Sequence, residues 1–192
     1  ITIQRVAVNS ANLIEGMQIR GVLGRFFLES HGVDLGNELA VINRAELSDT
    51  HIGLILTDTT TTEKPDTASA PVNWKVNLHA LNLKNVSFSM QLPADSMRLA
   101  AHVGEAQVND AEADLKNLHY GLRSFLVSGT SVNYDVGTAE PAEGFDPSHI
   151  ALRDIRIGLD SMYYRGRNMN AVIREFSMND RSGLSVTSLT GR

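Results

Sequence analysis

One spacing of apolar residues recurs along the chain and constrains its fold more than any other feature. In the clearest copy the apolar residues stand at offsets 0, 3, 5, 8 and 10, and they are Leu78, Leu81, Leu83, Val86 and Phe88, with Met90 continuing the alternation. On a helix, at about 100° per residue, these offsets point in every direction and mark no single face. In strands, offsets 3 and 5 share a face, and so do offsets 8 and 10. The spacing therefore predicts a small β unit.

This β unit is used repeatedly. Further copies, some of them weaker or broken, start at residues 3, 42, 103, 122, 152 and 173. Because the starts are irregularly spaced, a solenoid with a fixed coil length is disfavoured, and a meander with loops of varied length is favoured. We therefore expect an all-β fold with little helix, built as a repetitive antiparallel β-meander that is either curled into a groove or folded into a sandwich.

The two apolar arms of each unit are separated by polar residues that suit a sharp change of direction. Asn, Asp and Gly tolerate positive φ, so a two-residue hairpin turn is the first interpretation. A β-bulge or a corner within one continuous strand explains the same spacing. The pairs concerned are Asn9-Ser10, Ser48-Asp49, Lys84-Asn85, Asn109-Asp110, Ser128-Gly129 and Asn179-Asp180. The unit that starts at Leu152 departs from the pattern, since it has Gly158-Leu159 at the turn and Asp160 at an apolar position.

Composition and charge exclude several classes of function. The chain has 192 residues, which is long enough for one domain with a core, and a net charge of -5. Its lysines and arginines form no basic stripe with interleaved aromatic residues, so we expect no nucleic-acid partner. It has no cysteine, which excludes disulfides and thiolate metal sites. No apolar run approaches the length of a membrane-spanning helix.

The organisation along the chain follows from one polar segment. Residues 58–71 (DTTTTEKPDTASAP) are rich in threonine and interrupted by proline, which predicts a flexible loop. This loop would separate the first β units, in residues 1–57, from the main β sheet, in residues 72–192, within one continuous domain. Both ends of the chain fall inside strand patterns, so we expect an excised segment of a longer protein.

The search for catalytic, cofactor and metal sites is negative. None of the six histidines has another at i+2 or i+4, which is the usual spacing of metal ligands within one element. Glu140, Glu143 and Asp146 form an acidic group in a loop, but they lack the ordered ligand spacing of a calcium loop, so a solvated loop is the better interpretation. We expect no catalytic residue, no cofactor and no metal, and hence no enzyme.

The repeated positions amount to a long sheet with one apolar face, and such a face must be covered. A sandwich or closed barrel that fills its own interior is the simpler outcome on physical grounds. An open groove that receives lipid chains is the alternative, and periodicity alone does not choose between the two.

Several phrases of the sequence resemble a known family. The segments VNLHALNLKNVSFSMQLP (76–93), LHYGLRSFLVSGTSVNYD (118–135) and IALRDIRIGLDSMYYRG (150–166) resemble repeats of the AsmA-like superfamily. The segments GRFFLESHGVDL (24–35), FDPSHIALRDIRIGLDS (145–161) and SGLSVTSLTGR (182–192) resemble the N-terminal half of TamB-type proteins, as found in Bacteroidetes. The resemblance runs over essentially the whole chain.

The resemblance implies a non-enzymatic segment of a lipid-conduit protein that spans the periplasm. Such proteins are tethered to the inner membrane, here by a segment outside this chain, and support phospholipid transport to the outer membrane and outer-membrane assembly. The implied partners are phospholipid acyl chains, an outer-membrane β-barrel assembly protein and flanking repeats of the same chain. Asp160 would then interrupt the groove, because an unpaired buried carboxylate is costly. The alternative is a structural or adhesive β module that binds protein or glycan through its surface.

The groove interpretation predicts that one set of apolar side chains shares a face and meets lipid. These candidate lipid-facing residues are Leu81, Leu83, Val86, Phe88, Met90, Val103, Val108, Phe125, Val127, Val132, Tyr134, Ile155, Ile157, Met162, Tyr164, Phe176 and Met178.

Overall fold

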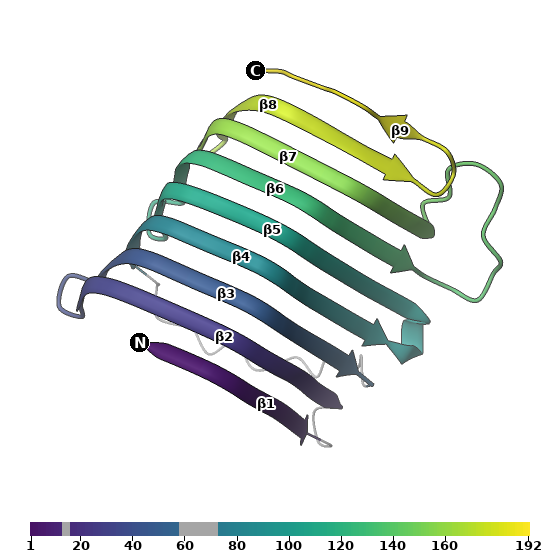
Figure 1. Ribbon diagram of the computed structural model, residues 1–192, viewed down its shortest axis with the longest axis horizontal. Coiled ribbons are helices and arrows are strands. Elements are labelled where there is room, and N and C mark those ends of the chain that lie inside the picture. The colour runs from purple at the N-terminus through teal and green to yellow at the C-terminus, as the bar shows by residue number, and fades with distance from the viewer. Residues whose placement is uncertain (13–15, 58–72) are drawn as a thin grey trace.

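The computed structural model describes residues 1–12, 16–57 and 73–192, and it is an all-β structure with 76% strand (Figure 1). These residues contain one 3-10 turn, η1 (Pro93–Asp95), and no helix long and apolar enough to cross a membrane. The strands are β1 (Thr2–Asn12), β2 (Met17–Asp34), β3 (Leu39–Leu56), β4 (Lys75–Leu92), β5 (Met97–Asp114), β6 (His119–Asp135), β7 (His149–Arg165), β8 (Asn168–Asp180) and β9 (Ser185–Val186).

All nine strands form a single sheet in which the spatial order equals the chain order. Every neighbouring pair is antiparallel except β3 and β4, which run parallel, with Leu39 beside Lys75. The prediction of an antiparallel meander is therefore confirmed, with this one exception. The start of β4 therefore lies beside the start of β3. The predicted flexible loop, 58–71, lies outside the described residues.

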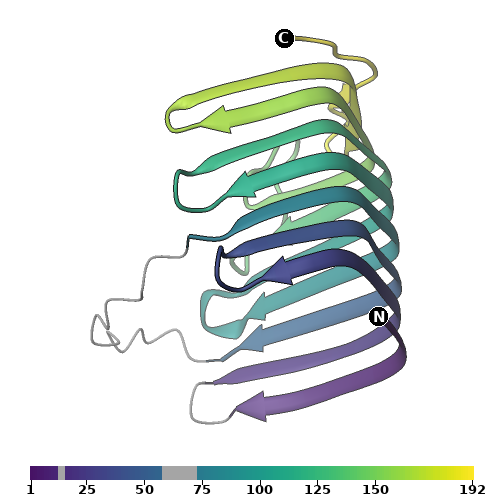
Figure 2. The same ribbon diagram turned by 90° about the vertical axis from the view of Figure 1, so that its left-hand side faces the viewer.

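The sheet is curled into a trough and is not closed into a barrel. Figure 2 shows the long strands bent back on themselves, so that both sets of strand ends lie on the same side of the molecule. We call the edge formed by the connections at 35–38, 115–118 and 166–167 the turn rim. The edge formed by the connections at 93–96, 136–148 and 181–184 is the loop rim.

The predicted two-residue hairpins are wrong, and the alternative of a corner within a strand describes the chain. Five of the six predicted turn pairs lie inside continuous strands, and the sixth, Asn179-Asp180, is the end of β8, where the chain turns into β9. In the middle of the sheet Asp49, Asn85 and Asp154 have φ of 51°, 53° and 53°, and Gly129 has φ of 60°. A residue with positive φ inserted in a strand is a bulge that bends the strand and leaves its apolar residues on one face. Facing positions in successive strands form a bend line made of Arg5, Gly24, Asp49, Asn85, Gly104 and Gly129, and Asp154 continues it across the register shift between β6 and β7.

The bend line brings backbones close together, and the sequence accommodates this at two glycines. A Cβ atom on Gly24 would lie 2.5 Å from the carbonyl oxygen of Asp49, and one on Gly104 would lie 2.8 Å from that of Gly129. Between these two positions, the Asn85 side-chain amide donates a hydrogen bond of 2.7 Å to Asp49 Oδ1. Residues that tolerate positive φ and residues without a Cβ thus share one line across the sheet.

The true turns of the turn rim use a motif that the sequence analysis missed. The β2–β3 connection reads DLGNE and the β5–β6 connection reads DLKNL. In the second, Asp114 Oδ1 accepts a hydrogen bond of 3.0 Å from the Asn117 backbone N–H, and the Asn117 side chain donates one of 2.8 Å to Asp114 Oδ2. The first connection repeats this arrangement with Asp34 and Asn37. Hydrogen bonds from these asparagines hold the pKa of both aspartates below its ordinary value.

Asp160 does not interrupt the apolar face, contrary to the sequence expectation. Leu159 pairs with Phe125 on one side and with Ile173 on the other, so the apolar row continues through Leu159. Asp160 stands at a register irregularity between β7 and β8, where its Oδ1 forms an exposed ion pair with Arg174 Nη1 at 3.0 Å. A bulge removes the carboxylate from the apolar row, so it need not be buried unpaired.

Candidate functional site: an open apolar trough

The concave face of the trough, which we call the inner face, is built from rows of cross-strand partners. Directly paired residues point to the same side of a sheet, so each row shares a face. One row runs through Leu83, Ala106, Val127, Ile157 and Phe176, and the next through Leu81, Val108, Phe125, Leu159 and Ile173. Beyond the bend line follow the pairs Val86–Val103, Phe88–Ala101 and Met90–Leu99, of which the last two continue to Val132 and Tyr134.

The structure therefore brings the predicted groove residues together on one face. Ile155 lies on the same face beside the bend line, where it pairs with Thr130. Met162 and Tyr164 also lie on this face, where they pair with Leu122 and Tyr120. Met178 lies at the end of β8, where it pairs with Val186.

The inner face also contains residues that the sequence analysis left out. Ile3, Phe26 and Leu47 form a row that continues into Leu83 through the parallel β3–β4 pairing. The same apolar spacing had marked the units at residues 3 and 42, so the signal was present in the sequence. The apolar face thus extends from β1 to β8.

Most of the inner face is only half covered. Among the described residues the buried apolar side chains are Ala45, Ala106, Val127 and Ile155, and none of the larger side chains is fully buried. Exposure reaches 37% for Phe88 in β4 and 46% for Val8 in the edge strand β1. A sandwich with two packed layers would bury many large side chains, so the trough is open along much of its apolar face.

Two hydroxyl groups lie beside the bend line, on the inner face, and each is hydrogen-bonded within its own strand. Thr50 and Thr130 are 3% and 8% exposed. The Thr50 hydroxyl donates to the Ser48 carbonyl oxygen at 3.0 Å, and that of Thr130 to the Ser128 carbonyl oxygen at 3.5 Å. Because each hydroxyl finds a partner in its own strand, neither leaves an unsatisfied polar group on the apolar face.

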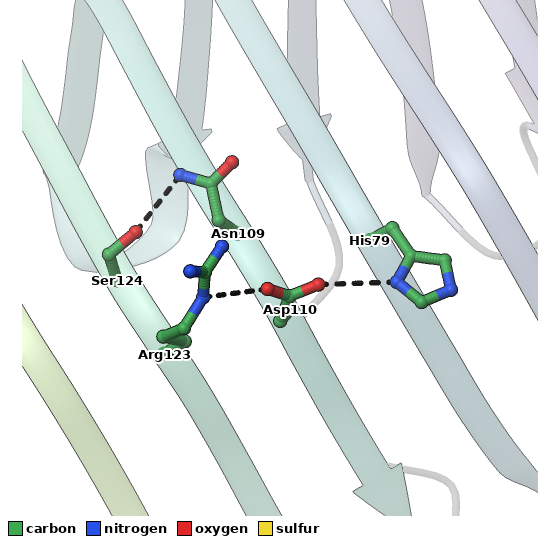
Figure 3. Close-up of polar contacts among 5 residues, drawn as sticks. All are labelled: His79, Asn109, Asp110, Arg123 and Ser124. Carbon is green, nitrogen blue, oxygen red and sulfur yellow. Dashed lines mark hydrogen bonds and ion pairs between the residues drawn. The ribbon is translucent and has the colours of Figure 1, made fainter.

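The opposite, outer face carries exposed polar ladders (Figure 3). Asp110 joins three strands, since its Oδ1 lies 3.2 Å from His79 Nδ1 and its Oδ2 accepts a hydrogen bond of 2.7 Å from Arg123 Nε. The contact with His79 first, and the Arg123 charge after it, lower the pKa of Asp110. Beside them the Asn109 side chain donates to Ser124 Oγ at 2.9 Å. These ladders link β4, β5 and β6 in the exposed wall.

The acidic loop between β6 and β7 has a structural role for Asp146. Its Oδ1 accepts a hydrogen bond of 2.9 Å from the Ser148 N–H, and its Oδ2 accepts one of 3.0 Å from the Ala142 N–H and lies 2.9 Å from His149 Nδ1. The backbone hydrogen bonds, followed by His149, lower the pKa of Asp146 to about 2. Both oxygens are engaged, and within the described ranges no group of three or more potential ligands could hold a metal ion.

No protein-family model matches this chain, and comparison with curated proteins finds no match either.

Proposed function

We propose that this chain is a non-enzymatic segment of a lipid-conduit protein of the TamB type in the AsmA-like superfamily. In this proposal the inner face of the trough receives phospholipid acyl chains. The whole protein would lie in the periplasm, tethered to the inner membrane outside this chain, and would support phospholipid transport to the outer membrane and outer-membrane assembly. An outer-membrane β-barrel assembly protein and flanking repeats of the same chain are the partners it implies.

The observation that carries this proposal is a continuous apolar face that the protein itself leaves uncovered. Apolar rows cross from β1 to β8, while Phe88 and Ile52, which pair across β3 and β4, remain 37% and 43% exposed. Exposed apolar surface of this extent is unfavourable in water and marks a binding site. Acyl chains suit it because they need no hydrogen-bonding partner.

The proposal is tested by recovering lipid from the purified chain and by placing a charge on the inner face. Phe88→Asp is the chosen variant, because the side chain is already exposed and the charge stays in contact with water. Ser89→Asp is the matched control on the opposite face of the same strand. We expect near-stoichiometric phospholipid from the wild type and from Ser89→Asp, and a several-fold loss from Phe88→Asp, measured by organic extraction and mass spectrometry.

Thermal unfolding of all three proteins accompanies the lipid measurement. The two variants should unfold within a few degrees of the wild type, since Phe88 is exposed, Ser89 is half-buried on the outer face, and substitutions at the surface usually change stability by about 0.5 kcal/mol or less. Absence of lipid from the wild type in both cell extracts and reconstitution would reject the proposal and favour the structural or adhesive module.

A further inference from the structure

A polar hollow of about 420 Å³ lies on the outer face beside the loop rim. Two connections at this edge of the sheet line it, namely the turn η1 between β4 and β5 and the start of the β6–β7 connection (Figure 1). The strands contribute a row of cross-strand partners, Gln91, Arg98 and Asp135. A volume of this size is in the range of small-molecule sites.

Strand register places this row on the outer face. Leu99 and Tyr134, which adjoin Arg98 and Asp135 in the sequence, pair with each other on the inner face. Successive residues of a strand point to opposite faces, so Arg98 and Asp135 point away from the trough. The hollow is therefore separate from the apolar lining, and an inference about it goes beyond the proposed function.

Arg98 and Asp135 are direct cross-strand partners of opposite charge, yet they form no salt bridge. Pairs of this kind usually stabilise a sheet by attracting each other. Here neither side chain lies within 4.0 Å of an opposite charge on any described residue. His149, the next residue of the row, is engaged by Asp146 at 2.9 Å, and Asp95 of η1 does not line the hollow. The lining thus holds one cation and one anion side by side, each without a partner among the described residues.

Two hydroxyl groups, of Ser96 and Thr138, also line the hollow, and backbone hydrogen bonds hold the connections that carry them. Ser96 has φ of 50°, and its N–H donates to the Pro93 carbonyl oxygen at 3.2 Å. At the base of the β6–β7 connection the Val136 N–H donates to the Ser148 carbonyl oxygen at 2.8 Å. The polar groups of the hollow are therefore positioned by structure on both sides.

We propose that this hollow binds a small zwitterion of the free amino acid class. The ligand carboxylate binds the Arg98 guanidinium, whose planar set of donors matches a carboxylate, and the ligand ammonium binds the Asp135 carboxylate. The Ser96 and Thr138 hydroxyls bind a polar ligand side chain. A molecule with both charges satisfies both side chains at once, which a simple anion or cation does not. Binding is weak, because the site stays in contact with water.

The test uses L-serine and two molecules that each lack one of its charges. Ethanolamine is serine without the carboxylate, and 3-hydroxypropanoate is serine without the ammonium. Each is titrated into the isotope-labelled whole chain, and the amide resonances of Ser96 and Gly137 are followed by NMR. We expect serine to bind about tenfold more tightly than either of the others, because losing one charge-assisted hydrogen bond costs about that factor.

Two variants remove the charges of the hollow one at a time. Arg98→Gln should bind serine no more tightly than the wild type binds ethanolamine, and Asp135→Asn no more tightly than it binds 3-hydroxypropanoate. Arg165→Gln is the matched control, since Arg165 lies on the outer face at the turn rim and pairs with His119. This control should bind serine as the wild type does.

The comparison of the three molecules on the wild type decides the proposal even if a variant fails to fold. Equal binding of all three, or the absence of shifts at Ser96 and Gly137 with serine, overturns it. Unchanged serine binding by a folded Arg98→Gln variant overturns it as well, and so does an equal loss in Arg165→Gln. Each of these outcomes leaves the lipid trough untouched, because the probes have no acyl chain.

Discussion

At the scale of single residues, the trough depends on a few positions where ordinary strand geometry fails. Asp49, Asn85 and Asp154 adopt positive φ on the bend line, as Arg5 does, and among L residues Asn and Asp tolerate this conformation best. Gly104 is needed for a different reason, since its φ is not positive but its neighbours leave no room for a Cβ. The bend line thus imposes two separate requirements, a positive φ at some residues and room for a neighbouring backbone at others.

Gly104→Ala should destabilise the chain by about 1–3 kcal/mol, because the new Cβ would lie 2.8 Å from the Gly129 carbonyl oxygen and 3.0 Å from that of Ser128. Gly32→Ala is the control, since nothing lies within 4 Å of its Cβ position. Thermal and urea unfolding should show a lowered midpoint for the first variant and little change for the second. Equal stability of Gly104→Ala and the wild type would mean that the bend line is not tightly packed.

At the scale of elements, the sequence predicts the strands and their apolar face better than it predicts where they end. The spacing around Leu81, Leu83 and Val86 excludes a helix and places these residues on one side, as found. It does not separate a hairpin from a bulge at Asn85, because the same residue types serve both and only the partner strand decides. The turn at Asp114–Leu118 contains the same types of polar residue, so its local sequence does not distinguish a turn from a bulge.

The candidate site, too, could be predicted only in part from the sequence. Membership of the inner face could be predicted, since it depends on local alternation within each strand. The extent of exposure could not, because it depends on how far the two walls of the trough stand apart. Phe88 and Val127 both occupy repeat positions on the inner face, yet the first is 37% exposed and the second 8%. A charged side chain at Val127 would therefore be buried and would destabilise the fold, whereas one at Phe88 stays in contact with water and tests lipid binding.

The loop between β6 and β7 gives a prediction about pH. The ionised Asp146 carboxylate accepts the loop's hydrogen bonds, and its pKa is lowered from 3.8 to about 2. Its stabilising contribution is therefore complete above about pH 4 and is lost as the pH falls through about 2. Asp146→Asn should unfold at a lower temperature than the wild type at pH 6, and this difference should shrink steadily below pH 4.

Differential scanning calorimetry from pH 6 to pH 2 measures this effect. Glu143→Gln is the control, because Glu143 is exposed in the same loop and forms no salt bridge with the described residues. A gap between Asp146→Asn and the wild type that stays constant across this range would show that the carboxylate charge does not hold the loop.

At the scale of the whole molecule, the chain exposes far more surface than a compact protein of its size. Its accessible surface is 12909 Å² for 20.9 kDa, whereas compact monomers of that mass expose about 9,000 Å². A large core is therefore not the main source of stability. Stability comes instead from the backbone hydrogen bonds between neighbouring strands and from the half-covered inner face. Each strand therefore depends chiefly on its immediate neighbours.

A sheet of this kind should lose structure from its edge, because stability in such arrays is close to a sum of nearest-neighbour terms. β1 has one strand partner, and its apolar residues Ile3, Val6 and Val8 are 42%, 38% and 46% exposed. β6 has long antiparallel partners on both sides and contains the buried Val127. Native-state hydrogen exchange should therefore show the lowest protection in residues 2–12 and the highest in residues 119–135.

Added phospholipid should raise protection in both segments, because a ligand that binds only the folded trough stabilises it by mass action. Uniform protection along the chain, with or without lipid, would instead indicate a single cooperative core and contradict the open trough.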